Sequence, residues 1–539
     1  MAQCGAMSSH RVRARAPRDE PHLPTLVRDP EALASVVEDA AHYPDGHASA
    51  VVQPASEGEV AALLRHASTV LPIGAQSSLT GGATPLGEVV LRTSRLASVL
   101  DVQPGSVRVQ AGMSLTELQT ALGARGLWYP PVPTYTGACC GGVVATNAAG
   151  PATFKYGTTR DWVLALVVVL PTGDVLDLER GQVHAHPDGY FEIELPQGPL
   201  RVPVATPRHP AVPKCSAGYY GRPGMDLVDL FIGSEGTLGV ITEVTFRVTP
   251  VPPARLTVMV QVPREEVGLE LAQALRAQSE AARTGNDRRG LDVASIEHLD
   301  ARSIELLRED GDDRRLGVEL AADTAAILFI EIELPDRAAE ADLWRQIEQA
   351  LTSNAEDVAA TRLCRTLHRF DLLASAEVVL PGHDARAKRL AELREAVPSA
   401  VNRRVALART AVSPAISKMA ADVIVPFDRF GELMVACRRA FESRGLDYAV
   451  WGHISDGNIH PNVIPRCVDD TPRGRSAVLE VGQAAIALGG SPLAEHGVGR
   501  NPVKKRLLEE FHGRRVVDQF RQIKAILDPT GKLAPGVLL

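Results

Sequence analysis

Histidines and acidic residues gather in two short stretches near the end of the sequence. These stretches read Trp451-Gly-His-Ile-Ser-Asp-Gly-Asn-Ile-His-Pro-Asn462 and Ala494-Glu-His-Gly-Val-Gly-Arg500. An odd spacing puts His453 and His460 on opposite faces of a straight strand, but the turn-forming residues between them allow the chain to fold back. Two imidazoles and the carboxylate of Glu495 would then hold a divalent metal and leave room for a substrate.

The same residues allow two other interpretations. His453 and His460 can be structural histidines that bracket a tight loop, since histidine has many roles besides metal binding. A site of two histidines and one glutamate can also activate water, which would make the chain a metal-dependent hydrolase. Residues 180–213 look like an insertion, and we expect its histidines to be surface loop residues: His184, His186 and His209.

Composition sets the class of protein. Of 539 residues, 45% are apolar and 23% are charged, and the net charge is -8. The chain can therefore bury a large core, and no overall positive field favours nucleic acid. No apolar run reaches the roughly 18 residues of a membrane span, and no secretory signal follows the N-terminal arginines. Seven scattered cysteines without a C-x-x-C pair indicate a reduced, cytoplasmic chain, and peripheral attachment to the inner face of a membrane stays open.

The chain divides into two regions with different patterns of predicted helices and strands, and these regions must position the histidines and acids. Residues 1–44 lack periodicity, and we expect them to be poorly structured; residues 45–250 alternate short β-type runs with helices, and prolines at 250–253 mark a boundary. Helices are expected at 56–68, 115–124, 265–282, 337–351, 384–396, 430–443, 475–488 and 503–526. Strands are expected at 50–54, 70–74, 88–92, 106–111, 164–170, 175–178, 238–248, 256–262, 326–334, 421–426 and 448–453. This is an α+β arrangement.

Three glycine-rich stretches lie within the first 250 residues. They are Pro72-Ile-Gly-Ala-Gln-Ser-Ser-Leu-Thr-Gly-Gly82, residues 136–161, and Phe231-Ile-Gly-Ser-Glu-Gly-Thr-Leu-Gly-Val-Ile241. Small residues in a row expose backbone N–H groups that can bind an anion, although each stretch alone is typical of a turn. Neither a P-loop nor a Rossmann fingerprint occurs.

Together, and in this order, the three stretches resemble the FAD-binding domain of the vanillyl-alcohol oxidase / para-cresol methylhydroxylase (PCMH) superfamily. The resemblance covers about residues 45–250 and implies two small subdomains that clamp an extended FAD. It implies that the cofactor is contacted by Gly74, Ser77, Ser78, Leu79, Thr80, Gly81, Gly141, Gly142, Asn147, Gly157, Thr158, Thr159, Glu235, Gly236, Gly239 and Ile241.

This sequence departs from the family pattern at several positions. Ala75 and Gln76 stand where the first loop usually has glycines, Val143 replaces an asparagine, and Ala534 replaces the asparagine of a terminal motif. Some relatives bond the flavin to a histidine in the first loop. The loop here has none, so we expect FAD to be bound non-covalently.

The two histidine stretches resemble the C-terminal region of the D-2-hydroxyacid dehydrogenases, which include D-lactate dehydrogenase, the flavin subunit of glycolate oxidase and D-2-hydroxyglutarate dehydrogenase. This resemblance implies that His453, His460 and Glu495 bind a divalent metal, with Zn and Mn as the candidates. It also implies that Asn462 contacts the substrate and that His496 is the catalytic base.

Oxidation of a 2-hydroxy acid needs residues of these types. The reaction removes a hydroxyl proton and moves the α-hydrogen to the flavin as a hydride, so a base and a cation on the substrate oxygens both help. The substrate carboxylate needs a positive partner. Arg394 and Lys418 are the candidates for it, and Arg403 and Arg404 compete for the same role.

The sequence thus predicts an FAD-dependent dehydrogenase or oxidase of a small D-2-hydroxy acid of the D-lactate, glycolate or D-2-hydroxyglutarate class. A non-catalytic flavin-binding subunit of a larger oxidase is the alternative beside the hydrolase. We expect an antiparallel-sheet cap with flanking helices over residues 251–490, and a C-terminal segment, 491–539, that returns to the flavin. The electron acceptor is open among a quinone, a cytochrome, an electron-transfer flavoprotein and oxygen. No nucleic-acid partner is expected, and a homodimer stays open.

Overall fold

Two sheets form the cores of the first half of the chain in the computed structural model, which describes residues 9–539. A parallel sheet has the order β2 (Ala50–Val52), β4 (Val89–Arg92) and β3 (Val70–Ile73). A five-stranded sheet has the order β5 (Val99–Gln103), β6 (Ser106–Gln110), β12 (Val240–Arg247), β8 (Val163–Val169) and β9 (Val175–Glu179). These sheets are the cores of the two expected subdomains, and the predicted fold class is confirmed.

Local side-chain bonds start the helices that connect these strands. Ser56 caps α2 (Glu57–His66) by accepting from the Glu59 N–H, and Ser114 forms a reciprocal capping box with Glu117 in α3 (Leu115–Gly123). The other helices of this half are α4 (Cys140–Thr146), α5 (Thr153–Tyr156), α6 (Thr159–Trp162) and α7 (Val228–Phe231). Strands β7 (Leu127–Trp128) and β13 (Thr249–Pro250) pair as a short ribbon.

The N-terminal segment is ordered, which corrects the expectation for residues 9–44; residues 1–8 lie outside the described part of the chain. Strand β1 (Arg11–Arg13) joins a hairpin from the predicted insertion, made of β10 (Tyr190–Leu195) and β11 (Gly198–Pro203), and α1 (Pro30–Ala34) follows. The guanidinium of Arg15 bridges Glu57 and Asp177 at 2.6 and 2.5 Å. Ion pairs of this kind hold an extended segment without the periodicity that a sequence pattern detects.

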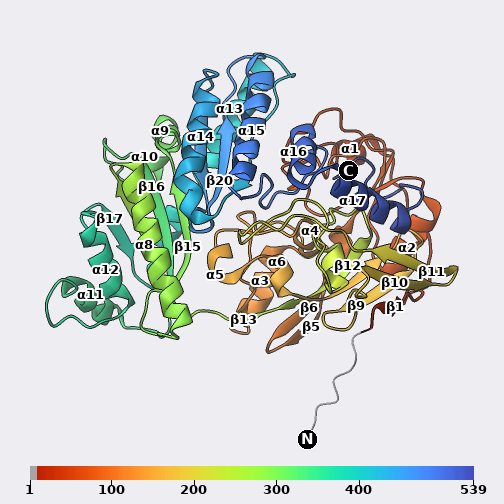
Figure 1. Cartoon of the computed structure of the whole chain (residues 1–539), viewed down its shortest axis with the longest axis horizontal. Coiled ribbons are helices and arrows are strands. Elements are labelled where there is room, and N and C mark those ends of the chain that lie inside the picture. The colour runs from red at the N-terminus through yellow and green to blue at the C-terminus, as the bar shows by residue number, and fades with distance from the viewer. Residues whose placement is uncertain (1–8) are drawn as a thin grey trace, which may run out of the picture.

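The second half is built on a seven-stranded antiparallel sheet, as predicted (Figure 1). Its order is β17 (Ala376–Val379), β14 (Ala254–Val262), β16 (Ala326–Leu334), β15 (Val293–Leu299), β19 (Tyr448–Gly452), β20 (Asn458–Val463) and β18 (Val423–Ile424). The helices of this cap are α8 (Glu265–Thr284), α9 (Ala301–Asp310), α10 (Asp312–Leu316), α11 (Glu340–Glu348), α12 (Ala359–Arg369), α13 (Asp384–Ala411), α14 (Phe430–Glu442) and α15 (Asp470–Ala487).

The predicted elements of the second half differ from the structure at several places, and the elements α9, α10, α12, β17 and β20 were not predicted. Strand β15 was not predicted, because all seven of its residues are buried and leave no polar alternation. Helix α13 continues through Pro398 past the predicted end at residue 396. The predicted last helix is broken at Gly513 into α16 (Pro502–His512) and α17 (Arg514–Leu527), where the backbone has φ +84°.

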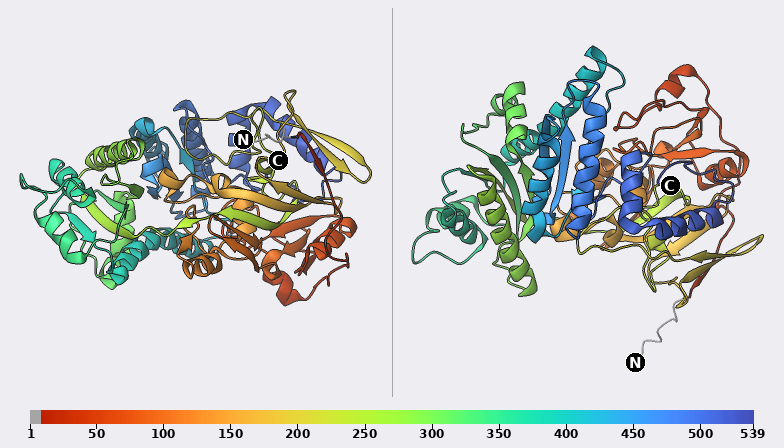
Figure 2. Two further views of the ribbon diagram at one scale, coloured as in Figure 1. Left: turned by 90° about the horizontal axis from the view of Figure 1, so that it is seen from below. Right: turned by 45° about the horizontal axis from the view of Figure 1, so that its top comes forward.

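The C-terminal segment returns to the first half of the chain, as expected. Helices α16 and α17 lie against the first half in Figures 1 and 2, and Leu508 and Phe520 join its hydrophobic core. The Val70 N–H donates to the Lys532 carbonyl, and the Ala534 N–H donates to the Val70 carbonyl at 2.8 Å. The last residues therefore extend the sheet that contains β3.

No helix between residues 9 and 539 is both long enough and apolar enough to span a membrane.

Candidate active site

A single cavity of about 1180 Å³ lies between the loops of the first half, the cap sheet and the C-terminal segment. Its volume exceeds the roughly 300–1000 Å³ of usual ligand sites, as a long cofactor together with a substrate would require. The wall contains the His453 and Glu495 side chains and also most of the predicted cofactor residues. Those that line it are Gly74, Ser77, Ser78, Leu79, Thr80, Gly141, Gly142, Glu235, Gly236, Gly239 and Ile241.

Five predicted cofactor residues lie behind this wall and shape the loops. Asn147 ends α4 in the left-handed region, and its Oδ1 accepts from the Arg160 N–H. Thr158 begins α6 in a capping box, and the Thr159 hydroxyl donates to the Ala148 carbonyl. Gly157, at φ +73°, and Gly81, at φ +77°, turn the backbone where side chains are rarely allowed.

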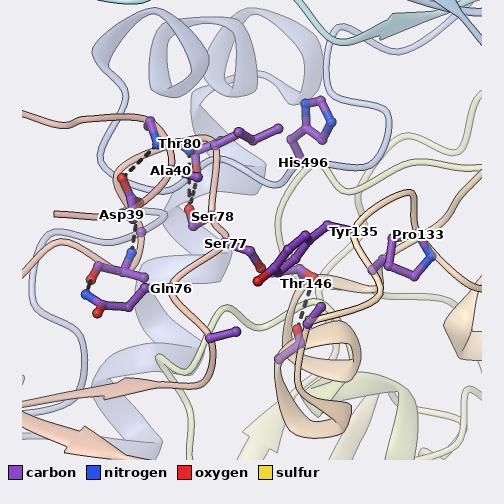
Figure 3. A pocket seen from close by; sticks show the side chains of 18 of the residues that line it. Asp39, Ala40, Gln76, Ser77, Ser78, Thr80, Pro133, Tyr135, Thr146 and His496 are labelled. Atoms are coloured by element: carbon purple, nitrogen blue, oxygen red, sulfur yellow. Dashed lines mark hydrogen bonds between the residues drawn. The ribbon is translucent and has the colours of Figure 1, made fainter. Parts of the chain in front are cut away.

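The first glycine-rich loop accommodates the two residues that replace glycines. Gln76 has φ +53°, so it keeps the left-handed backbone conformation of a glycine. Its Nε2 donates to the carbonyls of Val36 and Ala83 at 2.9 Å, which attaches the loop to the N-terminal segment. In Figure 3, Gln76, Ser77, Ser78 and Thr80 follow one another along this loop, and His496 reaches the cavity from another segment.

The second loop leaves space where a flavin dinucleotide would lie. Gly142 lines the cavity on α4, and a Cβ built on it meets no atom within 4 Å. Gly74, by contrast, approaches Cys139 so closely that its Cβ would lie 3.0 Å from the Cys139 Cβ. The two loops are thus packed together with an open cradle beside them, and the residues present fit an extended FAD.

The histidine stretches converge as the turn between them predicted. Strands β19 and β20 pair as a hairpin, and the three-residue turn Ile454–Asp456 lies between them. The Oε1 atom of Glu495 lies 3.4 Å from Nε2 of His453, 3.3 Å from Nε2 of His460 and 3.5 Å from Nε2 of His496. One carboxylate oxygen therefore faces three imidazoles in the cavity wall.

This spacing suits a bound cation. Bonds of about 2.0–2.2 Å to a tetrahedral metal put neighbouring ligand atoms about 3.3–3.6 Å apart. The three distances from Oε1 to the Nε2 atoms lie in this range, and imidazole nitrogens together with a carboxylate oxygen are typical zinc or manganese ligands. Asp422, His460, Glu495 and His496 also bring one ligand atom each to within 4.8 Å of one another.

Two buried carboxylates orient the imidazoles from behind. Glu297 on β15 accepts a hydrogen bond from Nδ1 of His453. The carboxylate of Asp422 lies 3.5 Å from Nδ1 of His460 and 3.5 Å from Nδ1 of His496, and it accepts from the N–H groups of Glu495 and His496. Sequence analysis missed both acids. Asp422 lies near the start of the predicted strand 421–426, close to Lys418, which is a weak signal, and Glu297 has no motif.

Neighbouring charges separate the protonation of the two hairpin histidines. Burial opposes a charge on His453, but Glu297 and Glu495 raise its pKa to about 9. Burial lowers the pKa of His460 to about 4, against the opposing effect of Glu495. Burial would raise the pKa of the Glu297 carboxyl, but Arg394 and His453 lower it to about 2. The pKa values of these two neighbouring rings thus lie on opposite sides of the ordinary value of histidine.

A buried lysine from the end of the predicted insertion completes this cluster, and sequence analysis missed it. Lys214 is 2% exposed, and its Nζ lies 2.8 Å from Oε2 of Glu495 and 2.9 Å from Oδ2 of Asp456. The ammonium holds one oxygen of Glu495, so only Oε1 faces the histidines. It also compensates two buried carboxylates, which would otherwise carry a large desolvation cost.

The two predicted partners of the substrate carboxylate, Arg394 and Lys418, differ in whether they already form ion pairs. Arg394 lines the cavity but is already paired with Glu297 and Glu395, at 2.5 and 2.7 Å. Lys418 also lines the cavity, and its Nζ donates to Oδ1 of Asn402. No carboxylate within the described chain pairs with Lys418. Burial lowers the pKa of the Lys418 ammonium to about 8.

Of the other candidates for substrate binding, Asn462 lies in the cavity wall, whereas Arg403 and Arg404 do not. Asn462 lies in the wall, and its Oδ1 is buried without a partner among residues 9–539. The proposed competition from Arg403 and Arg404 is wrong. These two arginines pair with Asp310 at the end of α9, because α13 turns that face toward α9, and they do not line the cavity.

Comparisons with known proteins agree with these features. Residues 48–179 match the family described as "FAD binding domain", and residues 267–538 match "FAD linked oxidases, C-terminal domain". The chain is 30% identical to a D-2-hydroxyglutarate dehydrogenase of Xanthomonas citri pv. viticola over 91% of this chain and 89% of that protein. It is 27% identical to a glycolate oxidase subunit of Bacillus subtilis, with coverage of 90% and 88%. Its fold resembles that of an alkyldihydroxyacetonephosphate synthase, with a TM-score of 0.61, 17% identity and coverage of 97% and 86%.

Proposed function

The chain belongs to the family of FAD-linked oxidases, and on that premise we propose that it oxidises a D-2-hydroxy acid to the corresponding 2-oxo acid. The observation that carries the proposal is the group of three imidazoles around Oε1 of Glu495, in the wall of the same cavity as the glycine-rich loops. FAD, when bound, supplies the acceptor for the hydride. The substrates proposed are of the D-lactate, glycolate or D-2-hydroxyglutarate class, as relatives with these names suggest.

His496 is the proposed base for the substrate hydroxyl. It is part of the cavity wall, and the Asp422 carboxylate lies beside its Nδ1 and orients the ring. Lys418 is the proposed partner of the substrate carboxylate because it has no carboxylate of its own, and Arg394 contributes positive charge beside it. The unpartnered Oδ1 of Asn462 is suited to accept from the substrate.

We also propose that His453, His460 and Glu495 hold a divalent metal, with Zn or Mn as the candidates. Such an ion would polarise the hydroxyl oxygen and lower the pKa of the hydroxyl group. The support is the ligand chemistry and the spacing of the nitrogen and oxygen atoms. Non-covalent attachment of FAD is proposed because the first loop has no histidine.

The remaining assignments follow the sequence. We propose an FAD-binding domain over residues 45–250, a cap over 251–490 and a returning segment over 491–539. Reduced enzyme would pass its electrons to a quinone, a cytochrome, an electron-transfer flavoprotein or oxygen. A cytoplasmic location, with contact at the inner face of a membrane as a variant, and a homodimer remain part of the proposal.

Anaerobic titration of the purified yellow protein tests the proposed reaction. D-lactate, glycolate and D-2-hydroxyglutarate are added separately while the flavin absorbance near 450 nm is followed, with L-lactate as the control. Bleaching by a D-acid or glycolate, and not by L-lactate, is the expected result. A yellow protein that none of these acids bleaches would be a passive flavin-binding subunit, and a colourless protein that hydrolyses esters or amides would be the hydrolase.

A further inference from the structure

We propose that Arg92 binds the diphosphate of FAD and supplies the positive charge that the first glycine-rich loop itself lacks. Arg92 is the last residue of β4 and lines the cavity. It belongs to none of the motifs described above. The inference depends on FAD binding, which the family establishes, and does not depend on which acid is oxidised.

The sheet places Arg92 beside the start of the first loop. In the parallel pairing of β3 and β4, Arg92 is the partner of Ile73, the residue directly before Gly74. The hydroxyl of Thr93 donates to the Ile73 carbonyl at 3.3 Å and holds the two strand ends together. The Arg92 side chain therefore enters the cavity where the loop 74–82 leaves the sheet.

The second loop approaches the same place. Gly74 packs directly against Cys139, the residue before α4. Burial and Glu117 raise the pKa of the Cys139 thiol, and the Arg92 guanidinium acts in the opposite direction because its charge lies nearby. Arg92 thus lies where the two loops meet, beside the cradle at Gly142.

Arg92 has no partner inside the described chain. Its Nε is buried without a hydrogen bond, and the guanidinium forms no ion pair with any of residues 9–539. The two other arginines in the cavity wall belong to the cap: Arg394 pairs with two glutamates, and Arg475 bonds to the Ser417 hydroxyl. A half-buried guanidinium without a counterion is suited to a doubly charged, oxygen-rich anion, and a planar fork of donors matches phosphate oxygens.

The composition of the loop explains why a side chain is needed. Loop 74–82 contains no lysine or arginine, and the Gln76 amide is bonded to Val36 and Ala83 on the other side of the loop. Backbone N–H groups can cradle the phosphates but carry only partial charge. The full positive charge at this junction comes from Arg92.

The test measures FAD release from the full-length holoenzyme of three variants. Dilution of Arg92→Met, Arg92→Lys and wild-type protein is followed by the rise in flavin fluorescence as FAD dissociates. Loss of a charge-assisted contact should raise the dissociation constant about 10–100-fold in Arg92→Met. Arg92→Lys should recover part of the affinity, and added salt should weaken FAD binding less in Arg92→Met than in wild type. Arg95→Met is the matched control, since Arg95 is exposed and bonds only to the Gln53 carbonyl.

A second measurement separates the diphosphate from the flavin ring. The midpoint potential of the bound flavin, measured at saturating FAD, should be the same in Arg92→Met as in wild type. An unchanged dissociation constant in a folded Arg92→Met protein would overturn the assignment. So would a shifted midpoint potential, because that result would place the charge at the ring. If Arg92→Met does not fold, Arg92→Lys is used instead. FAD affinity below that of wild type would then support the assignment, and unchanged affinity with an unchanged salt response would overturn it. Wild-type protein that binds no FAD would instead contradict the proposed function.

Discussion

Nζ of Lys214 and Oε2 of Glu495 lie 2.8 Å apart in the interior of the protein, and this pair joins the first half of the chain to the C-terminal segment. Because Lys214 occupies one oxygen of the carboxylate, the other oxygen is directed at the three histidines. The lysine comes from neither histidine stretch, yet it determines how Glu495 is presented. The predictions below begin with this contact.

Replacing Lys214 should destabilise the protein. Lys214→Met removes the ammonium that pairs with both Glu495 and Asp456, and removing one member of a buried ion pair typically costs about 3–5 kcal/mol. Urea unfolding of Lys214→Met should show that loss in the free energy of unfolding. Lys214→Arg keeps the charge and should lose less. Equal stability of Lys214→Met and wild type would mean that the carboxylates are compensated by another group.

Removing the proposed base should stop turnover without removing the colour. His496→Ala should lower kcat about 10²–10⁴-fold, the usual contribution of general-base catalysis, and should keep the visible flavin spectrum. His186→Ala, on the hairpin near β10, is the control and should be fully active. Turnover by His496→Ala at the wild-type rate would exclude His496 as the base.

Metal binding should depend on the ligands and on the acid behind them. His460→Ala should abolish tight binding of Zn²⁺ and Mn²⁺, measured by calorimetry and by metal analysis of the purified protein. Asp422→Asn should weaken it about 10–100-fold, since Asp422 lies behind the rings of His460 and His496 and supports the ligands from there. FAD content should not change in either variant. A chelator-treated wild type that keeps full activity would contradict the metal proposal.

Substrate affinity should fall at alkaline pH. Burial lowers the pKa of Lys418 to about 8, so the ammonium loses its proton as the pH rises through that value, while the substrate carboxylate stays anionic. KM should therefore be low below pH 8 and should rise above it. Lys418→Arg stays charged throughout this range and should flatten the profile. A wild-type KM that is constant from pH 7 to pH 9.5 would remove Lys418 from the substrate site.

Filling the open space beside Gly142 should weaken FAD binding. Gly142→Ala places a methyl group in the cavity and should weaken FAD binding, although alanine in helix α4 should leave the melting temperature of the FAD-free protein equal or higher. Gly123→Ala, in helix α3 with open space around it, is the matched control and should not change FAD affinity. Normal FAD affinity in Gly142→Ala would place the cofactor elsewhere.

The sequence was sufficient for the parts of the site that are local. The turn residues between His453 and His460 predicted that both rings face one point, and the glycine-rich stretches predicted the loops of the cavity wall. Lys214, Glu297 and Asp422 were not predicted as site residues, because each reaches the cluster from a different element through tertiary packing alone. A charged residue inside an apolar strand or an irregular loop carries no periodic signal.

The N-terminal segment and β15 were missed for related reasons. Arg15 is held by ion pairs to residues that are distant in the sequence, and such pairing leaves no local pattern. Strand β15 is buried on both faces, so the polar alternation of a half-exposed strand is absent. Periodicity in a sequence arises when one face of a helix or strand contacts solvent and the other is buried. Neither the N-terminal segment nor β15 has one buried and one exposed face.

The closing of the first sheet by the final residues has a consequence for biosynthesis. The Val70 backbone bonds to Lys532 and Ala534, and the Glu235 carboxylate accepts from the N–H groups of Val498 and Gly499. The sheet that contains β3 can therefore be completed only after residues 532–534 have been synthesised, so folding of the first half depends on a segment that is made much later. Uptake of the dinucleotide between the two would follow that step.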